Sequence, residues 1–482
     1  MNSGYTDHGV QFKPDHDSID QMDHSANTSA DGAQTRWILP ATILGSSLSF
    51  IDSSVVNVAL PAMQRDLHAS LATMQWVVNG YMLMLASLIL PGGSAGDRFG
   101  RRRVFLIGLC AFVIASLACA LAPGTAWLIA ARLVQGVAAA LLVPASLAIV
   151  GAAFTGAARG RAIGTWAGAA ALTTALGPPL GGWLVDTISW RAIFYINIPI
   201  GALAALFALR IPSDRPPAKR TPLDLVGATL AVVSLGLLCD GLITLGRADR
   251  ISGLAELIAA AAAVACFIRV EHRGRAPMMP LTLFHNRAFS GVNVLTVLLY
   301  ATMTGVLFLL PFVLINARGY SASAAGAAFL PLPVIMGSGS RSAGALGARY
   351  GAGLPMTVGA CLTGSGFALL ALCTNDASYW TGTLPGIIVV AIGMTIAVPP
   401  LTTTVFDSSP VALSGIASGI NNTAARAGGL IAVAALGLAF GTTGTASIPA
   451  ATLLSAYRLV LFVAAGVAVL GGLIAALTVR RN

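Results

Sequence analysis

Two charged residues stand inside long apolar stretches of the sequence. Asp52 lies nine residues before Pro61, and Arg132 lies eight residues after Gly124. A charge placed inside a bilayer costs at least about 2.5 kcal/mol, so both residues are expected to face protein and to serve a function. If both stretches are helices, each charge lies about 12 to 13 Å from the same membrane face at 1.5 Å per residue.

Because these depths agree, Asp52 and Arg132 can form an ion pair wherever their helices adjoin. A nearby arginine favours the charged form of a carboxylate, whereas burial favours the protonated form. A conformational change that separates or dries the pair would therefore switch Asp52 between binding and releasing a proton. The alternative is a static ion pair that fixes helix packing.

A stretch rich in glycine and arginine, residues 93–103 (GSAGDRFGRRR), separates two apolar runs. Asp97 can accept backbone N–H bonds at a neighbouring helix N-terminus, where the helix dipole favours an anion. Such a contact would hold one conformation and release in another. The alternative is a positively charged loop that only sets membrane orientation. The candidate gating residues are Gly93, Asp97, Arg98, Gly100, Arg101 and Arg102.

Polar side chains recur at three- and four-residue spacing in several apolar runs, which indicates helix faces turned away from lipid. Together they fit a central cavity with sparse polar groups among apolar and aromatic walls. Each could instead form hydrogen bonds between helices. The candidate cavity residues are Ser49, Ser53, Asn57, Tyr81, Gln135, Trp166, Asn293, Tyr300, Asn422 and Arg426.

The composition indicates what kind of protein must position these side chains. Only 10% of the 482 residues are charged and 56% are hydrophobic, whereas soluble domains carry about 25% charged residues. So few charges cannot cover a water-facing surface, which excludes a soluble enzyme, a disordered scaffold and a disulfide-stapled secreted domain. The six cysteines fall inside apolar runs as packing residues, and no metal site is expected.

Apolar runs of about 20 residues are long enough to cross a bilayer as helices. The sequence predicts an all-α membrane protein with fourteen transmembrane helices. The expected spans are 37–60, 73–95, 104–123, 125–150, 161–184, 190–209, 223–245, 252–270, 288–315, 322–347, 353–373, 379–404, 414–440 and 457–478.

Lysine and arginine predict the orientation in the cytoplasmic (inner) membrane. With both termini in the cytoplasm, 20 of the 28 basic residues face the cytoplasm, 6 face outward, and Arg132 and Arg426 lie within the membrane. This bias favours cytoplasmic termini and an even number of spans. It also accounts for the net charge of +10 through the anionic inner leaflet, without nucleic acid.

An internal repeat predicts two similar halves. Residues 93–100 (GSAGDRFG) recur as residues 344–351 (GALGARYG), with Ala348 at the position of Asp97, eight spans later. Two six-helix bundles with a two-helix insertion explain this offset, and repeated halves around a midplane site are typical of secondary transporters. The expected parts are a disordered acidic cytoplasmic tail at 1–36, bundles at 37–209 and 288–482, and the linker with two inserted helices at 210–287.

The positions of the lysines restrict the possible energy sources of transport. A phosphate-binding loop needs a lysine followed by serine or threonine. Lys13 precedes Pro14 and Lys219 precedes Arg220, and the chain has no other lysine. An ATP-driven pump of that kind is excluded, which leaves ion-gradient coupling or facilitation and no bound cofactor.

Six motifs follow one another along the chain, at residues 51–61, 93–103, 131–136, 177–182, 190–201 and 418–429. In this order they resemble the motifs of the major facilitator superfamily and of its fourteen-span drug–proton antiporter branch. The resemblance implies that the first and fourth spans adjoin, that Arg132 is the family's buried arginine and that residues 93–103 form a gate. It also implies a seal against leakage at Gly177, Pro178, Gly181 and Gly182, whose spacing alone indicates a packing groove.

The sequence and the resemblance together predict proton-coupled efflux of small lipophilic or cationic toxic compounds, by a monomer and without enzymatic activity. An adaptor protein is left open. Export of an endogenous metabolite or lipid is the first alternative, because an apolar cavity does not identify the compound that it binds. A receptor-like membrane protein without transport is the second.

Overall fold

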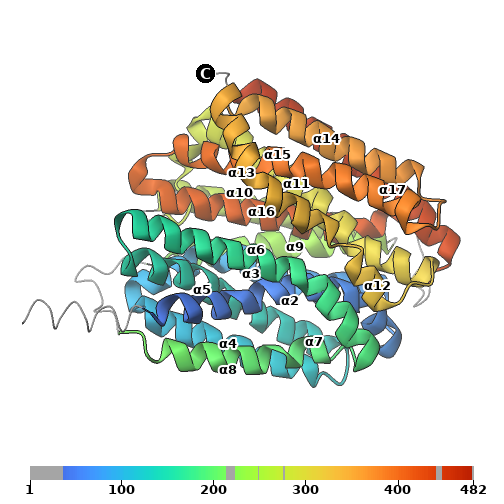
Figure 1. The fold of residues 1–482 in the computed structure, drawn as a ribbon, viewed down its shortest axis with the longest axis horizontal. Helices are drawn as coiled ribbons and strands as arrows, with labels where there is room; N and C mark the ends of the chain where they lie inside the picture. The colour runs from blue at the N-terminus through green and yellow to red at the C-terminus, as the bar shows by residue number, and fades with distance from the viewer. Residues whose placement is uncertain (1–35, 213–222, 248, 275–276, 441–447, 480–482) are drawn as a thin grey trace, which may run out of the picture.

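The computed structural model describes residues 36–212, 223–247, 249–274, 277–440 and 448–479. Within these ranges the regular structure is entirely helical (Figure 1). The tail expected at residues 1–36 lies outside the described residues except for Arg36, and so does most of the linker after Pro212.

The helices before the linker form what we call the N-terminal group. They are α2 (Ile38–Asp66), α3 (Leu71–Phe99), α4 (Arg101–Ala120), α5 (Thr125–Ala153), α6 (Gly156–Thr187), α7 (Ala192–Tyr195) and α8 (Asn197–Ala208). Two further helices, α9 (Leu225–Gly246) and α10 (Arg250–Arg273), occupy the place of the expected insertion.

The helices after Leu281 form the C-terminal group. The main ones are α11 (Arg287–Phe312), α12 (Ala322–Ala327), α13 (Pro331–Tyr350), α14 (Gly353–Leu372), α15 (Leu384–Asp407), α16 (Ser414–Ala435) and α17 (Ala450–Thr478). Short 3₁₀ or π segments connect them: η1 (Leu281–His285), η2 (Val313–Ala317), η3 (Tyr379–Thr383), η4 (Val411–Leu413) and η5 (Leu436–Ala439).

All fourteen expected spans are helical, but within the described ranges twelve helices are long and apolar enough to cross a membrane. The expected fifth span, α6, has 32 residues and lacks sufficient hydropathy because glycine, threonine and proline are frequent in it. The expected sixth span is divided at Ile196 into α7 and α8, so Ala192–Ala208 is apolar but short.

The two groups repeat one packing scheme. In the N-terminal group α2 packs on α6 and α8, and α5 packs on α3 and α4; in the C-terminal group α11 packs on α16 and α17, and α15 on α13 and α14. The N-terminal group fills the lower part of Figure 1 and the C-terminal group the upper part.

The groups meet along two seams. In one seam α12 packs on α6, and in the other α16 packs on α3. The inserted helix α9 contacts both α3 and α16, whereas α10 packs on α9 and buries only 11% of its apolar window. The insertion therefore covers the α3–α16 seam and leaves α10 at the periphery.

Glycine ends the helix at both copies of the repeated sequence. Gly100 follows α3 with φ 95°, and Gly351 follows α13 with φ 75°. Only glycine adopts this left-handed region without strain. The repeat thus preserves a helix stop, which explains why glycine stands at both positions although Asp97 is replaced by Ala348.

Candidate functional site

The centre of the N-terminal group contains a buried ion pair. The Asp52 Oδ2 atom on α2 lies 2.5 Å from the Arg132 Nη1 atom on α5. Gln135, one turn further along α5, donates from Nε2 to Asp52 Oδ1 at 3.0 Å and accepts a bond from Arg132 Nη1 at 2.7 Å. Asp52 and Gln135 are fully buried and Arg132 is 1% exposed, so the cluster is dry.

Aromatic side chains complete the surroundings of Arg132. Its guanidinium lies 4.3 Å from the centre of the Tyr81 ring and 5.9 Å from that of Phe194. Its Nε donates to the carbonyl of Val77 at 3.2 Å, and the Tyr81 hydroxyl is 2.6 Å from the hydroxyl of Ser49. The cation is therefore held by a carboxylate, a carbonyl, an amide and two ring faces.

The local sequence explains why the helices approach closely here. Gly136 follows Gln135 on α5, and a Cβ at that position would collide with the backbone of Tyr81 on α3. Glycine thus lets α5 touch α3, while the preceding residue, Gln135, reaches Asp52 on α2. Both carboxylate oxygens of Asp52 are engaged, and removing one member of a buried pair costs about 3 to 5 kcal/mol. Separation of the two side chains would leave each charge buried without its partner.

The candidate gating residues lie at the junction of α3 and α4. The carboxylate of Asp97 accepts bonds from the Arg101 side chain at 3.2 and 3.3 Å, and both side chains are partly exposed. Arg102 donates to the carbonyls of Ala208 and Leu209, at 3.1 and 2.8 Å, and so holds the end of α8. In these contacts Asp97 binds an arginine side chain, whereas the sequence predicts a backbone N–H at a helix N-terminus as its partner. Arg102 binds carbonyls at the C-terminus of α8.

The glycine motif of α6 lies between two other helices. A Cβ at Gly177 or Gly181 would collide with Ser54 or Val55 of α2, and one at Gly182 would collide with the backbone of Ala322 in α12. In return, a Cβ at Gly326 of α12 would collide with the carbonyl of Pro178. The motif therefore forms a close-packed joint between the two groups.

Asp186 strengthens this joint, although the sequence patterns did not single it out. Its carboxylate accepts the backbone N–H bonds of Ala322 and Ser323, at 3.1 and 2.7 Å, and the Ser323 hydroxyl at 2.6 Å. A side chain of the N-terminal group thus caps the first turn of α12 in the C-terminal group.

The opposite end of α6 is open. A Cβ at Gly160, Gly164 or Gly168 would meet no atom within 4 Å, and the same holds for Gly337 and Gly344 of α13. In α6, the only buried residue before Gly177 is Ala162. The α6 seam is therefore closed at the end near Thr187 and open toward Gly156.

The candidate cavity residues divide into two sets. Ser49, Tyr81 and Gln135 belong to the closed cluster around Arg132 and do not line open space. The others are distributed over four helices. Ser53 and Asn57 lie on α2, Trp166 lies on α6 with its ring 5.9 Å from that of Phe50, Asn293 and Tyr300 lie on α11, and Asn422 and Arg426 lie on α16.

On α16, Asn421 makes the contact with α11, and the predicted cavity residue Asn422 lies next to it in the sequence. Asn421 donates to Asn293 Oδ1 at 3.2 Å and to the Thr296 hydroxyl at 2.8 Å, both on α11. Asn422 is exposed and bonds only the carbonyl of Ser418, one turn back on its own helix, among the described contacts. Arg426 lies close enough to Tyr81 and Tyr300 to interact electrostatically with both hydroxyl groups.

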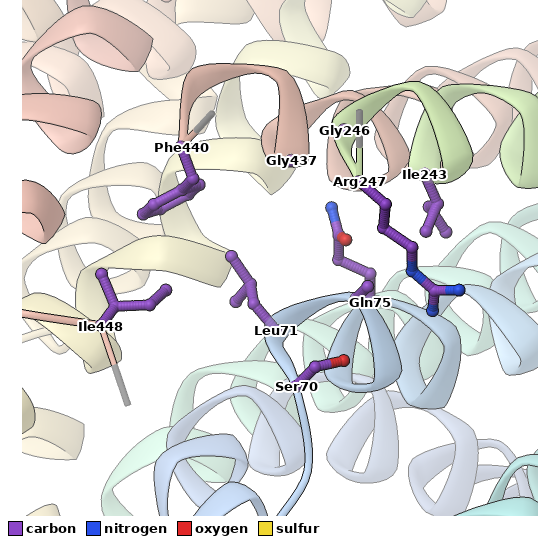
Figure 2. A pocket seen from close by; sticks show the side chains of 10 residues that line it. Ser70, Leu71, Gln75, Ile243, Gly246, Arg247, Gly437, Phe440 and Ile448 are labelled. Atoms are coloured by element: carbon purple, nitrogen blue, oxygen red, sulfur yellow. The ribbon is translucent and has the colours of Figure 1, made fainter. Parts of the chain in front are cut away.

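Two pockets lie at the ends of the seams. One, of about 250 Å³, is lined by α3, α9 and η5, and Figure 2 shows Gln75 reaching across it from α3. Gln75 Nε2 donates to the carbonyl of Val433 on α16 at 2.6 Å. The other, of about 300 Å³, lies beside Asp186 and Tyr320. Within the described ranges, no group of three or more histidine, cysteine or acidic residues could hold a metal ion.

Comparisons with known proteins agree with this architecture. Residues 42–433 match the Major Facilitator Superfamily. The tetracenomycin C resistance and export protein of Streptomyces glaucescens is 35% identical over 427 residues, which cover 87% of this chain and 79% of that protein. The methylenomycin A resistance protein of Bacillus subtilis (strain 168) is 35% identical over 419 residues, 86% of this chain and 88% of that protein.

The fold also resembles solved transporter structures. A POT family transporter in complex with 5-aminolevulinic acid has a TM-score of 0.68 with 13% identity, over 91% of this chain and 94% of that chain. At this identity the likeness concerns the fold alone. The predicted resemblance to the family is thereby confirmed in both sequence and fold.

Proposed function

This chain belongs to the major facilitator superfamily, and from that premise we propose that it exports small lipophilic toxic compounds in exchange for protons. Relatives that are named for drug resistance or export, such as those for tetracenomycin C and methylenomycin A, support export. The proton gradient is the energy source, and no bound cofactor takes part.

The buried pair of Asp52 and Arg132 is the observation that carries the proposal of proton coupling. Asp52 is the only acid in the described contacts of the cluster, and both of its oxygens are engaged. When the helices move apart, a proton on Asp52 replaces the lost contact with Arg132. The carboxyl then carries that proton to the other side and releases it when the pair re-forms.

In the complete proposal, the chain spans the inner membrane fourteen times with both termini in the cytoplasm. The N-terminal and C-terminal groups are two six-helix halves, and α9 and α10 are inserted between them. The repeated packing scheme of the two groups supports this division. The distribution of arginine and lysine supports the orientation.

In this orientation, the described conformation faces the cytoplasm. Gly182, Gly326 and Asp186 close the outer end of the α6 seam, and Gly164 and Gly337 face open space at the inner end. A compound enters between the groups from the cytoplasmic side. Closure of the inner end and release of the Asp186 cap then expose it to the outside.

Reconstitution into liposomes with an imposed pH gradient tests the proposal. The cargo panel combines dyes, antiseptics and antibiotics, and a trapped pH dye reports proton movement coupled to transport. The Asp52→Asn variant is expected to insert normally and to lose gradient-driven transport by at least 100-fold. Asp240→Asn, on α9, is the matched control and should retain it. Undiminished uphill transport by Asp52→Asn would refute the coupling role.

A further inference from the structure

Arg426 is an intramembrane cation that has no acidic partner in the described part of the chain. It lies 12 residues into the 22-residue helix α16, and its Nε is buried without a hydrogen-bond partner. Across the described ranges, its side chain takes part in no ion pair, because the three ion pairs involve Arg101, Arg132 and Arg191. A charge in such a place is costly unless something compensates it.

The residues around Arg426 place it where the two groups meet. Three residues before it, the Thr423 hydroxyl donates to the carbonyl of Ala86 on α3 at 3.4 Å. Three residues after it, Gly429 lies against Met82 of α3 and Thr304 of α11. The guanidinium is also within electrostatic range of Tyr81 and Tyr300. This face of α16 therefore turns toward the centre of the molecule.

Among the residues that the structure describes, no acid is placed to neutralise this cation. Asp52 has both oxygens bound, by Arg132 and Gln135. From residue 287 to the end, the sequence contains two acids. Asp376 lies in the loop before η3 and Asp407 is the last residue of α15, so both lie at helix ends. With Asp52 and Arg132 cancelling each other, the centre carries a net charge of one from Arg426.

We propose that Arg426 binds the anionic group of the exported compound and that the preferred cargo is a lipophilic acid, such as a carboxylate or an ionised phenol. The inference rests on the proposed export function and narrows its substrate class. The guanidinium offers paired N–H donors that match a carboxylate, and its Nε has no competing partner. The same positive charge opposes the binding of organic cations.

A matched set of ligands tests the proposal on the purified full chain in lipid nanodiscs. Calorimetry compares naphthaleneacetate, naphthaleneacetamide and naphthylethylammonium, which share one ring system and carry charges of −1, 0 and +1. Two further acid–amide–amine sets on biphenyl and anthracene frames cover differences in shape. The wild type is expected to bind at least one acid tenfold or more tightly than its amide and its amine.

Three variants separate charge from structure. Arg426→Gln should abolish the preference for the acid, and Arg426→Lys should retain most of it. Arg458→Gln removes an exposed arginine on α17 and should leave the preference unchanged. If Arg426→Gln does not fold, loss of the preference in wild type at low pH, where the acids are protonated, provides the second test.

Failure of this inference can be told apart from failure of the export function. Equal binding of acid and amide in every set, or binding of no acid at all, overturns the role of Arg426. A retained acid preference in Arg426→Gln overturns it as well. Each of these three results leaves gradient-driven export by the wild type intact, whereas absence of that export in liposomes refutes the proposed function itself.

Discussion

The N-terminal and C-terminal groups repeat one packing scheme but treat a buried arginine in opposite ways. Arg132 is surrounded by Asp52, Gln135, a carbonyl and two aromatic rings, and it is almost completely buried. Arg426 pairs with no acid of the described ranges, and its buried Nε has no hydrogen-bond partner there. The first arginine is therefore balanced by an acid of this chain, whereas in our proposal the second is balanced by the anionic group of the cargo. Stability measurements on variants of the two arginines test this difference.

The largest effect is expected from removing each arginine in turn. Arg132→Leu leaves the buried carboxylate of Asp52 uncompensated and should destabilise the protein by about 3 to 5 kcal/mol. Arg426→Leu removes an unpaired charge and should leave the stability unchanged or increase it. Thermal unfolding of the purified variants in one detergent measures both. Equal destabilisation by the two substitutions would break the contrast.

A double substitution provides the control for the first prediction. In Asp52→Asn/Arg132→Leu the orphaned charge is gone, so the variant should recover part of the stability that Arg132→Leu loses. Full additivity of the two single effects would show that the ion pair contributes nothing.

A smaller loss of stability is expected when the amide side chains Gln135, in the N-terminal group, and Asn421, in the C-terminal group, are replaced. Gln135→Met removes bonds to two charged groups and should cost about 1.5 to 3 kcal/mol. Asn421→Leu removes bonds to the uncharged side chains of Asn293 and Thr296 and should cost about 0.5 to 1.5 kcal/mol. The same unfolding assay compares the two variants. A larger loss for Asn421→Leu would reverse the expected order.

The smallest effect concerns an exposed acid of the C-terminal group. The Thr381 hydroxyl, and then the Ser378 amide, donate to Asp376 and hold the pKa of its carboxyl below the ordinary value of 3.8. Because the folded pKa is the lower one, the stabilisation is complete above pH 3.8 and is lost as the pH falls through the folded pKa.

Asp376→Asn should therefore flatten the pH dependence of the unfolding temperature below about pH 4, where the wild type loses stability. Unfolding scans between pH 6 and pH 3 measure the difference. Parallel curves for wild type and variant over this range would contradict the prediction.

Much of the central site was accessible from the sequence because charge in lipid is rare. Arithmetic on Pro61 and Gly124 put Asp52 and Arg132 at one depth, and the two residues are in contact in the structure. The aromatic and amide partners of Arg132 were harder to foresee. These contacts depend on how side chains from three helices point toward one another, and the spacing of residues along one helix carries no information about that.

Other features were missed for identifiable reasons. Asp186 lies at a helix end, where a charge costs little free energy and so does not stand out as functional. Its partners are backbone N–H groups, which every residue type except proline carries. Asn421 and Asn422 are adjacent, and a four-residue stripe drifts from the true helical period, so the spacing selected Asn422 and passed over Asn421, which makes the contact between α16 and α11. The interruption at Ile196 comes just before Pro199, which has no N–H to donate to the carbonyl of Tyr195, so this proline was a signal that the count of apolar residues passed over.

The position of α9 bears on the route by which a lipophilic compound reaches the centre of the molecule. Because α9 touches α3 and α16 together, it covers that edge of the molecule. Within the described ranges, the opposite edge lies between faces of α6 and α13 where a Cβ added at Gly164 or Gly337 would meet no atom within 4 Å. In the proposed export cycle, this uncovered edge gives a lipophilic compound in the inner leaflet a lateral path to the centre, on the side away from α9.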